Sequence, residues 1–273
     1  MPAIRFLVIM KHITSRENAI YKETLKLTRK KYRDQSGCFL LEGIKPLKDA
    51  CQSSAEIERI FIDEEKYNEL SENEEWIHEL ESLICVLDKK LFHGLSDTEN
   101  SQGMISIVRK PEIGRADLKD LFSDGNVVVL DRLQDPGNIG TIIRTAEAAG
   151  YRAVIVIKGT GDIYSPKVVR AAAGSILRVP VIFCETADAA AELLQETGKK
   201  LTVTCLEDAV SCFDIDLTRD IALVIGNEGQ GVSSAFIDLA DIKVKIQMEG
   251  RIESLNAAVA AGILMYQSVG GKI

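Results

Sequence analysis

Short apolar runs recur through the second half of the chain, and longer stretches of helical character separate them. Runs that are apolar on both faces are typical of parallel strands buried between helices. The predicted strands are Val127–Leu130, Ala153–Ile157, Val181–Phe183, Leu201–Thr204, Ile221–Ile225 and Lys243–Ile246. The predicted helices are Ile139–Ala149, Pro166–Ala173, Ala187–Thr197, Ser233–Leu239 and Leu255–Tyr266. The pattern predicts an α/β domain over residues 121–273, with a parallel sheet covered on both faces.

The first half also alternates between strands and helices. Its predicted strands are Cys38–Gly43, Glu58–Asp63, Leu83–Leu87 and Met104–Val108. Thr14 and Glu17 have the spacing of a capping box, which predicts a helix that begins there and continues through Arg33. Elements of this size predict a compact three-layer domain over residues 1–108. No nucleophile lies next to a base in this half, so we expect a recognition module.

The stretch RKPEIGRADLKD, residues 109–120, breaks the apolar pattern with proline, glycine and mixed charge. Such a composition favours a loop, and we predict a linker between two domains here.

The net charge of −8 argues against a nucleic-acid partner, but the distribution of charge points the other way. Residues 11–48 carry ten Lys or Arg against four Asp or Glu, and residues 56–81 carry two against eleven. A phosphate backbone would be attracted to one face and repelled by the other. Two solvated helix faces of opposite charge explain the same pattern equally well.

The six cysteines show no C-x-x-C spacing, and the three histidines are scattered. We therefore expect reduced, mostly buried thiols, no metal site and no Ser/His triad. No apolar run has the length of about 20 residues that a membrane helix needs. The opening stretch MPAIRFLVIM lacks a secretory cleavage site, so we expect a cytoplasmic protein. Met10 is a second candidate for the start of translation.

Three polar loops follow predicted strands, and each leads into a helix. The first lies within Leu130–Gly150 and brings Asn138 and Arg144 onto one helix. Ligands of such folds bind at the edge of the sheet where the strands end. Apolar residues surround Arg144 in the sequence, and its planar guanidinium suits a phosphate or a carboxylate. An ion pair between Arg144 and Glu147 on the helix surface is an equally good interpretation.

The second loop, Gly226–Gly231, has the sequence GNEGQG. Its glycines permit a close approach of the backbone to a ligand. The spacing differs from that of dinucleotide-binding folds, and no phosphate-loop lysine follows. Because Glu228 would repel a pyrophosphate, this loop favours a ligand without phosphates.

The third loop, IQMEGRIESLN, covers residues 246–256. Ser254 is a natural N-cap for the final helix, and Asn256 follows within the predicted first turn. Met248 and Leu255 are either core residues or the apolar walls of a small-molecule slot. The final helix is apolar nearly all round, so it must be buried under the sheet or in a subunit interface.

Taken together, the stretches DPGNIGTIIRTAEAAG, LVIGNEGQGVS and IQMEGRIESLNAAVAAGILMYQ resemble the three motifs of the SpoU/TrmH group of RNA ribose 2′-O-methyltransferases, in the family's order. This group belongs to the SPOUT superfamily. The stretches ITSRENAIYKETLKL and FLLEGIKPLKDA are similar to the substrate-binding domain of the ribosomal-RNA branch, which has a ribosomal-protein L30e-like fold. The resemblance implies two α/β domains, with a trefoil knot in the second. It also implies a homodimer formed through the second domain.

The resemblance further implies the cofactor S-adenosyl-L-methionine and a set of site residues. The catalytic and substrate-handling positions are Asn138, Arg144, Glu228, Ser254 and Asn256. The cofactor-binding positions are Gly226, Asn227, Ile246, Met248 and Leu255. Gln247 departs from the family pattern, in which proline stands between the Ile and the Met, and we expect a freer loop there. We favour Arg144 as a phosphate anchor over a general base, because a guanidinium stays protonated under ordinary conditions.

The implied reaction is methyl transfer to a ribose 2′-hydroxyl of 23S ribosomal RNA. Two alternatives stay open: a transfer-RNA 2′-O-methyltransferase, and a non-catalytic RNA-binding ribosome-assembly protein of the same fold. A nucleotide-using α/β enzyme is disfavoured because phosphate-loop chemistry is missing. The sequence does not identify the RNA or the nucleotide, since RNA loops are recognised by shape and stacking.

Overall fold

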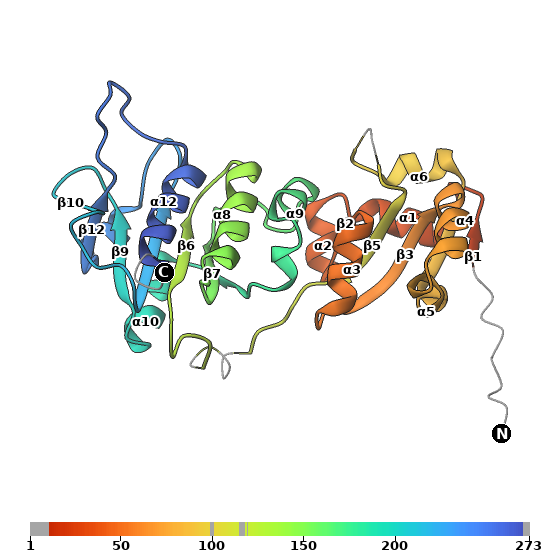
Figure 1. Cartoon of the computed structure of the whole chain (residues 1–273), viewed down its shortest axis with the longest axis horizontal. Coiled ribbons are helices and arrows are strands. Elements are labelled where there is room, and N and C mark those ends of the chain that lie inside the picture. The colour runs from red at the N-terminus through yellow and green to blue at the C-terminus, as the bar shows by residue number, and fades with distance from the viewer. Residues whose placement is uncertain (1–10, 99–100, 115–117, 119, 270–273) are drawn as a thin grey trace. The chain divides into compact units, whose positions relative to one another are not determined.

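The structure is a computed structural model that describes residues 11–98, 101–114, 118 and 120–269. Contacts divide the chain into two units, Met1–Lys110 with Tyr164–Pro166, and Pro111–Ile163 with Lys167–Ile273. Figure 1 labels their elements. Residues 1–10, on which the expectations about a secretory segment and a start at Met10 rest, lie outside the described residues.

The first unit is built on a mixed sheet with the strand order β1-β4-β3-β5-β2. The strands are β1 (Lys11–Ile13), β2 (Cys38–Glu42), β3 (Ile57–Asp63), β4 (Ile84–Leu87) and β5 (Met104–Arg109). The helices are α1 (Ala19–Lys26), α2 (Lys30–Ser36), α3 (Ile44–Gln52), α4 (Glu64–Asn73), α5 (Trp76–Glu79) and α6 (Lys89–Leu95), with a 3-10 turn at Glu81–Leu83. β3 runs parallel to β4 and antiparallel to β5.

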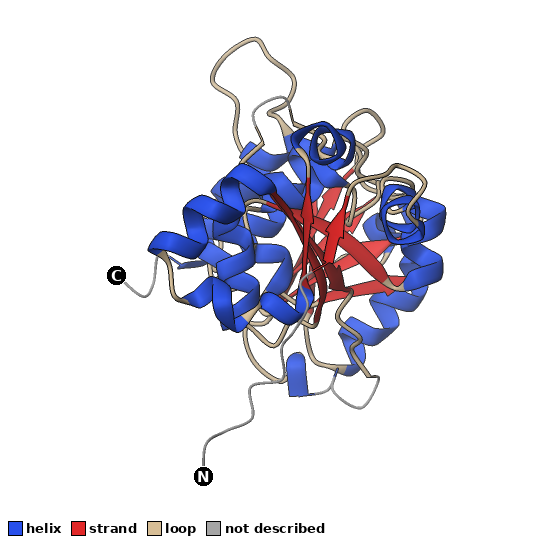
Figure 2. Cartoon of the chain, turned by 90° about the vertical axis from the view of Figure 1, so that its right-hand side faces the viewer, coloured by secondary structure: helices blue, strands red, loops and turns tan. Residues whose placement is uncertain are grey.

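Alternation along β3 separates two cores, because successive side chains of a strand point to opposite faces. Phe61 packs with Leu27 of the α1–α2 region and with Phe92 of α6, whereas Ile60 and Ile62 belong to the core under α3, α4 and α5. Helices therefore lie on both sides of the strands (Figure 2). As a consequence, the basic α1–α2 segment and the acidic α4–α5 segment lie on opposite faces of this sheet.

The first helix differs from its prediction at both ends. Asn18, not Thr14, is the N-cap, because its side chain accepts hydrogen bonds from the backbone N–H groups of Ile20 and Tyr21. The helix also ends at Lys26, and a second helix begins at Lys30. The guanidinium of Arg33 is buried and donates to the carbonyl of Leu27, which stabilises the break between the two helices.

The second unit is built on a parallel sheet with the strand order β10-β12-β9-β11-β6-β7-β8. The strands are β6 (Val127–Asp131), β7 (Ala153–Ile157), β8 (Val181–Cys184), β9 (Lys200–Thr204), β10 (Val210–Ser211), β11 (Ile221–Gly226) and β12 (Ile242–Lys245). The helices are α8 (Pro136–Ala148), α9 (Pro166–Ala172), α10 (Ala187–Glu196), α11 (Ser234–Asp238) and α12 (Ala257–Val269), with a 3-10 turn at Ser175–Leu177. The prediction of two α/β domains, the second with a parallel sheet, is confirmed.

Helices cover both faces of the parallel sheet. Val127 and Val129 of β6 pack in one core with residues of α10 and α11. On the other face, α8 contacts β6 and β7, and α12 contacts both α8 and β11. The β10 strand was not predicted, since its two residues give no apolar run. No helix among the described residues is long and apolar enough to cross a membrane.

The thiols are less uniformly buried than the sequence predicts. Three cysteines are buried, two are half-buried, and Cys51 is exposed; all six are free.

Candidate functional site

The first two polar loops begin side by side because β6 and β11 pair in parallel register. Leu130 lies opposite Ile225, and Asp131 opposite Gly226, so both strands end at the same edge of the sheet. Gly226 is required by the tight return of its own loop: a Cβ atom there would lie 2.3 Å from the backbone of Gly231 and of Val232. The first and second loops, which are distant in sequence, therefore start at the same edge of the sheet.

The carboxylate of Glu228 joins these two loops. Its Oε1 accepts hydrogen bonds from the backbone N–H of Asp135 and from Nδ2 of Asn138, both at 3.1 Å. Its Oε2 accepts from the backbone N–H of Gln134 at 3.1 Å. Three donors of the first loop therefore converge on one side chain of the second.

The third loop joins this group through Asn256. Nδ2 of Asn256 donates to Oδ1 of Asn138 at 2.8 Å, so a chain of hydrogen bonds runs from Glu228 through Asn138 to Asn256. Oδ1 of Asn256 accepts from the backbone N–H groups of Ala258 and Val259, at 3.0 and 3.3 Å. The structure thus brings together residues that the sequence separates by more than one hundred positions.

Asn256 is also the residue that caps the final helix, which corrects the prediction for Ser254. Because α12 begins at Ala257, two residues later than expected, Ser254 lies outside the helix. Its side chain is exposed and has no hydrogen-bond partner among the described residues. Ser254 is therefore free to contact a ligand, but it is not part of the hydrogen-bonded group.

Opposing effects set the ionisation of Glu228. Partial burial raises the pKa of its carboxyl, but the hydrogen bonds from Asn138 and from the backbone outweigh that effect and place the pKa below the ordinary value. A carboxylate that accepts several hydrogen bonds is stabilised in its charged form. Glu228 is consequently ionised at neutral pH and acts only as an acceptor toward the first loop.

Asn227 fixes the second loop with both ends of its side chain. Nδ2 donates to the carbonyl of Arg132 at 2.8 Å, and Oδ1 accepts from the backbone N–H groups of Gly229 and Gln230 at 2.9 Å. Both polar ends of the Asn227 side chain are therefore engaged in hydrogen bonds within the protein. A ligand would contact the loop that Asn227 holds in place.

The third loop offers a different surface. From Gln247 to Leu255 the backbone has no hydrogen-bond partner in the described part of the chain. Ile246, Met248 and Leu255 are half-buried in this segment. The loop therefore combines free backbone donors and acceptors with apolar side chains, which is the composition of a small-molecule site.

Arg144 lies on α8, beyond Asn138, and does not join the hydrogen-bonded group. It is exposed and has no hydrogen-bond or ion-pair partner among the described residues. The alternative ion pair with Glu147 is wrong, because Glu147 is engaged elsewhere. Its carboxylate binds Nε and Nη2 of Arg178, the latter at 3.0 Å, and accepts a hydrogen bond from the hydroxyl of Ser175. These partners, Arg178 first, lower the pKa of Glu147.

Two residues of the site were missed by the sequence analysis. Gln134 closes the first loop, since its Nε2 donates to the carbonyls of Arg132, Leu133 and Gly159 at 2.9, 3.2 and 2.6 Å. Arg178 keeps Glu147 away from Arg144. Neither residue belongs to a recognisable spacing, because their partners are set by the tertiary fold.

The chain is an α/β protein in which hydrogen bonds link three polar loops at the edge of the sheet where β6 and β11 end. The model of the SpoU rRNA methylase family matches residues 125–266, and that of the MRM3-like substrate binding domain matches residues 18–106. The chain therefore belongs to the SpoU rRNA methylase family.

Similar proteins cover nearly the whole chain. The 23S rRNA (guanosine(2553)-2′-O)-methyltransferase RlmP of Bacillus subtilis is 34% identical over 94% of this chain and 98% of its own length. The 23S rRNA (uridine(2479)-2′-O)-methyltransferase of Streptomyces viridochromogenes is 30% identical over 96% of this chain and 93% of its own. The crystal structure of the AdoMet-bound rRNA methyltransferase from Sinorhizobium meliloti has a TM-score of 0.85 at 29% identity and covers 96% of this chain and 98% of that one.

The link between Glu228 and Asn138 can be tested with Asn138→Asp. The substitution places a second carboxylate against Glu228, and two adjacent carboxylates raise the pKa of one of them. We expect a loss of about 1–2 kcal/mol at pH 8, or about 2–8 °C in the melting temperature of a domain of this size. The deficit should shrink toward pH 5, because one carboxyl then takes up a proton and the repulsion ends.

Asn138→Ala is the matched control for that experiment. It removes the hydrogen bond to Glu228 without adding charge, and it also removes the acceptor for Asn256, which Asn138→Asp keeps. Its deficit in melting temperature should therefore change little between pH 5 and pH 8, whatever its size. Equal pH dependence in both variants would contradict a contact between residues 138 and 228.

Proposed function

We propose that the protein is an S-adenosyl-L-methionine-dependent methyltransferase that acts on a ribose 2′-hydroxyl of 23S ribosomal RNA. The observation that carries this proposal is the hydrogen-bond chain from Glu228 through Asn138 to Asn256, which assembles all three loops at one edge of the sheet. The printed names of two relatives, RlmP and the Streptomyces enzyme, describe 2′-O-methylation of 23S rRNA. Ribosomal RNA as the substrate would place the protein in the cytoplasm.

The residues present fit S-adenosyl-L-methionine. The solved relatives from Sinorhizobium meliloti and Streptomyces viridochromogenes hold AdoMet. In this chain the free backbone groups of Gln247–Leu255 suit the polar edges of an adenosine and an amino acid, and Ile246, Met248 and Leu255 suit its flat apolar faces. Gly226 permits the tight return of the second loop, and we assign it to the same cofactor site by its place in the motif. When bound, the cofactor supplies an electrophilic methyl group.

Arg144 is the residue that we assign to the RNA. A guanidinium that has no partner among the described residues is available for a phosphate, which matches its planar set of donors. Binding of the phosphate next to the target ribose would fix the 2′-oxygen, and well-oriented reactants gain about 7–11 kcal/mol over the bimolecular reaction. The proton of the 2′-hydroxyl then leaves to the anchored phosphate or to water. Asn138, Glu228 and Asn256 hold the loops around this position, and exposed Ser254 lies within the third loop.

We also propose a homodimer formed through the second domain. α12 buries Ala261, Leu264 and Met265 but exposes Val259 and Tyr266, which are 51% and 52% exposed. Apolar side chains on the outer face of a helix favour a partner surface. In this proposal one face of α12 packs within its own unit, and the opposite face packs against a second copy of the chain. The trefoil knot stays a prediction.

The proposal is tested by mapping 2′-O-methyl groups in ribosomal RNA from cells with and without the gene. We expect the loss of one modification in 23S rRNA and its return when the gene is restored. Unchanged 23S rRNA together with a lost modification in transfer RNA would move the substrate to transfer RNA. No change in either RNA, with no binding of S-adenosyl-L-methionine by calorimetry, would support a non-catalytic assembly protein.

Arg144→Ala should lose most turnover and keep cofactor binding. The loss should reach at least about 100-fold, as expected for a group that positions charge in the transition state. The measurements are single-turnover methylation of 23S rRNA and calorimetric titration with S-adenosyl-L-methionine. Arg219→Ala, which removes an exposed arginine from the opposite edge of the sheet, is the matched control. Methylation by Arg144→Ala at nearly the normal rate would refute the assignment.

Arg178→Ala should lower turnover indirectly. Without Arg178, Glu147 is free to pair with Arg144, which lies three residues earlier on the same helix. We expect a loss of about two- to fivefold, the size of a surface ion pair. The double variant Arg178→Ala/Glu147→Gln should recover the lost rate, because no carboxylate then competes for Arg144. If the double variant stays as slow as the single one, Arg178 acts through its other contacts.

A further inference from the structure

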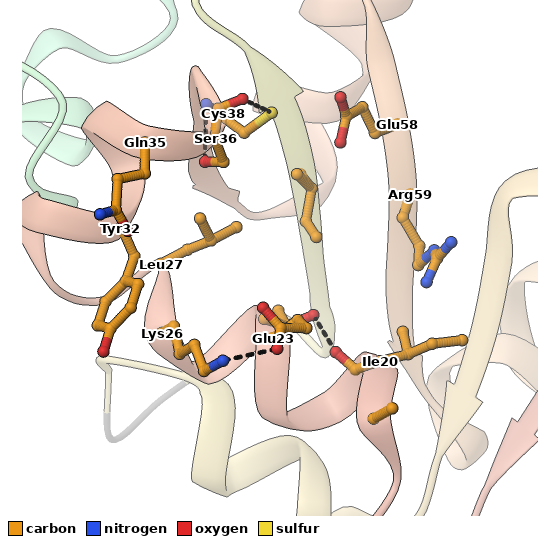
Figure 3. A pocket seen from close by; sticks show the side chains of 13 residues that line it. Ile20, Glu23, Lys26, Leu27, Tyr32, Gln35, Ser36, Cys38, Glu58 and Arg59 are labelled. Carbon is orange, nitrogen blue, oxygen red and sulfur yellow. Dashed lines mark hydrogen bonds and ion pairs between the residues drawn. The ribbon is translucent and has the colours of Figure 1, made fainter.

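The first unit contains a pocket of about 520 Å³ that its own residues form. Helices α1 and α2 line one side, and strands β3 and β5 line the other (Figure 3). Ile20, Leu27 and Ile107 supply apolar surface. Burial raises the pKa of the Cys38 thiol to about 11, so this side chain stays neutral and adds to that surface. The volume lies within the range of about 300–1,000 Å³ that small-molecule sites occupy.

The polar side chains of the pocket divide into paired and unpaired groups. The Glu23 carboxylate binds Lys26 at 2.6 Å, and the Glu58 carboxylate binds Arg109. Gln35 and Arg59 line the same pocket and have no hydrogen-bond or ion-pair partner in the described part of the chain. The acidic groups are therefore neutralised, while an amide and a guanidinium remain available to a ligand.

Tyr32 gives the pocket an aromatic wall. The ring is half-buried, and the ammonium groups of Lys26 and Lys31 lie 5.7 and 5.9 Å from its centroid. Figure 3 shows Tyr32 and Arg59 on opposite sides of the pocket, with Leu27 between them. Unpaired RNA bases are bound in this manner, by stacking on an aromatic ring or a guanidinium and by hydrogen bonds to the base edge.

The charge around the pocket matches a strand of RNA better than a single small molecule. Lys22, Arg29, Lys30 and Lys31 are exposed on α1, on α2 and between them. These cations extend along the helices beyond the pocket, so they can meet several consecutive phosphates. The acidic α4–α5 segment lies on the opposite face of the sheet, which leaves one face of the module for the backbone.

We propose that this pocket binds one unpaired nucleotide of the RNA substrate. The base enters the pocket and stacks on Tyr32 at one wall, Arg59 is available at the opposite wall, and the neighbouring phosphates lie along the cations of α1 and α2. The identity of the RNA rests on the proposed function, but base binding does not require methyl transfer. The module thereby selects RNA that carries an unstacked base.

The test is the binding of fluorescently labelled oligonucleotides to the full chain, measured by anisotropy at low salt. The probes are nine-nucleotide strands of rA and of rU, and an abasic strand with the same ribose-phosphate backbone. We expect at least one of the strands that carry bases to bind about tenfold more tightly than the abasic strand, the effect of one stacked base. Tyr32→Ala should remove that difference and leave the affinity for the abasic strand unchanged.

Three further variants separate stacking from charge and from folding. Tyr32→Phe keeps the ring and should keep the preference for strands with bases. Lys30→Ala should weaken the binding of all strands alike, since it removes a phosphate contact that lies off the Tyr32 ring. Phe213→Ala removes an exposed aromatic ring of the second unit and should change neither affinity.

The proposal is overturned if strands with and without bases bind equally to the wild-type chain, or if Tyr32→Ala keeps the preference. It is also overturned if free AMP or UMP binds as tightly as the corresponding strand, which would indicate a nucleotide-binding pocket unrelated to RNA. A chain that shows the base preference but methylates no RNA would refute the proposed function and leave this inference standing. The two failures are thus distinguishable.

Discussion

The Glu228 carboxylate is the acceptor on which the site depends. Loops that are polar and rich in glycine lose conformational entropy when they become ordered, so something must hold them. Glu228 does so because its two oxygens accept from two backbone N–H groups and from Asn138 at once. Asn138 then passes the connection to Asn256, which also caps α12. One charge thus orders two loops and fixes the start of a helix.

The contacts of Glu147 explain why Arg144 has no partner in the part of the chain that the structure describes. A long cationic side chain on a helix normally finds a carboxylate three or four residues away, and Glu147 stands at that spacing. The protein directs Glu147 to Arg178 and Ser175 instead, and both partners come from outside α8. Arg144, on the helix that follows the first loop, can therefore bind a phosphate without losing a partner among the described residues.

The sequence predicted the parallel sheet well, since β6, β7 and β11 are apolar throughout and leave little choice of structure. The sequence predicted the helix starts less well, because two neighbouring residues could each serve as the N-cap. Ser254 and Asn256 are both good caps, and only the link to Asn138 selects Asn256. Thr14 and Asn18 present the same ambiguity at α1. The pairing of Glu147 also depends on Arg178, which lies 31 residues away along the chain. Local spacing cannot reveal such contacts.

The first unit offers recognition of RNA at two ranges. Electrostatic attraction acts over about 10 Å at ordinary salt, so the basic face of the first unit acts before any base is in contact. Attraction alone does not distinguish one RNA from another, because every RNA carries the same phosphates. Discrimination then requires short-range contacts of the kind that Tyr32, Gln35 and Arg59 offer. The acidic α4–α5 face supports this recognition, because it repels RNA that approaches the sheet from the side away from the pocket. A chain with a net charge of −8 can therefore bind RNA, since the sign of a face matters more than the sign of the sum.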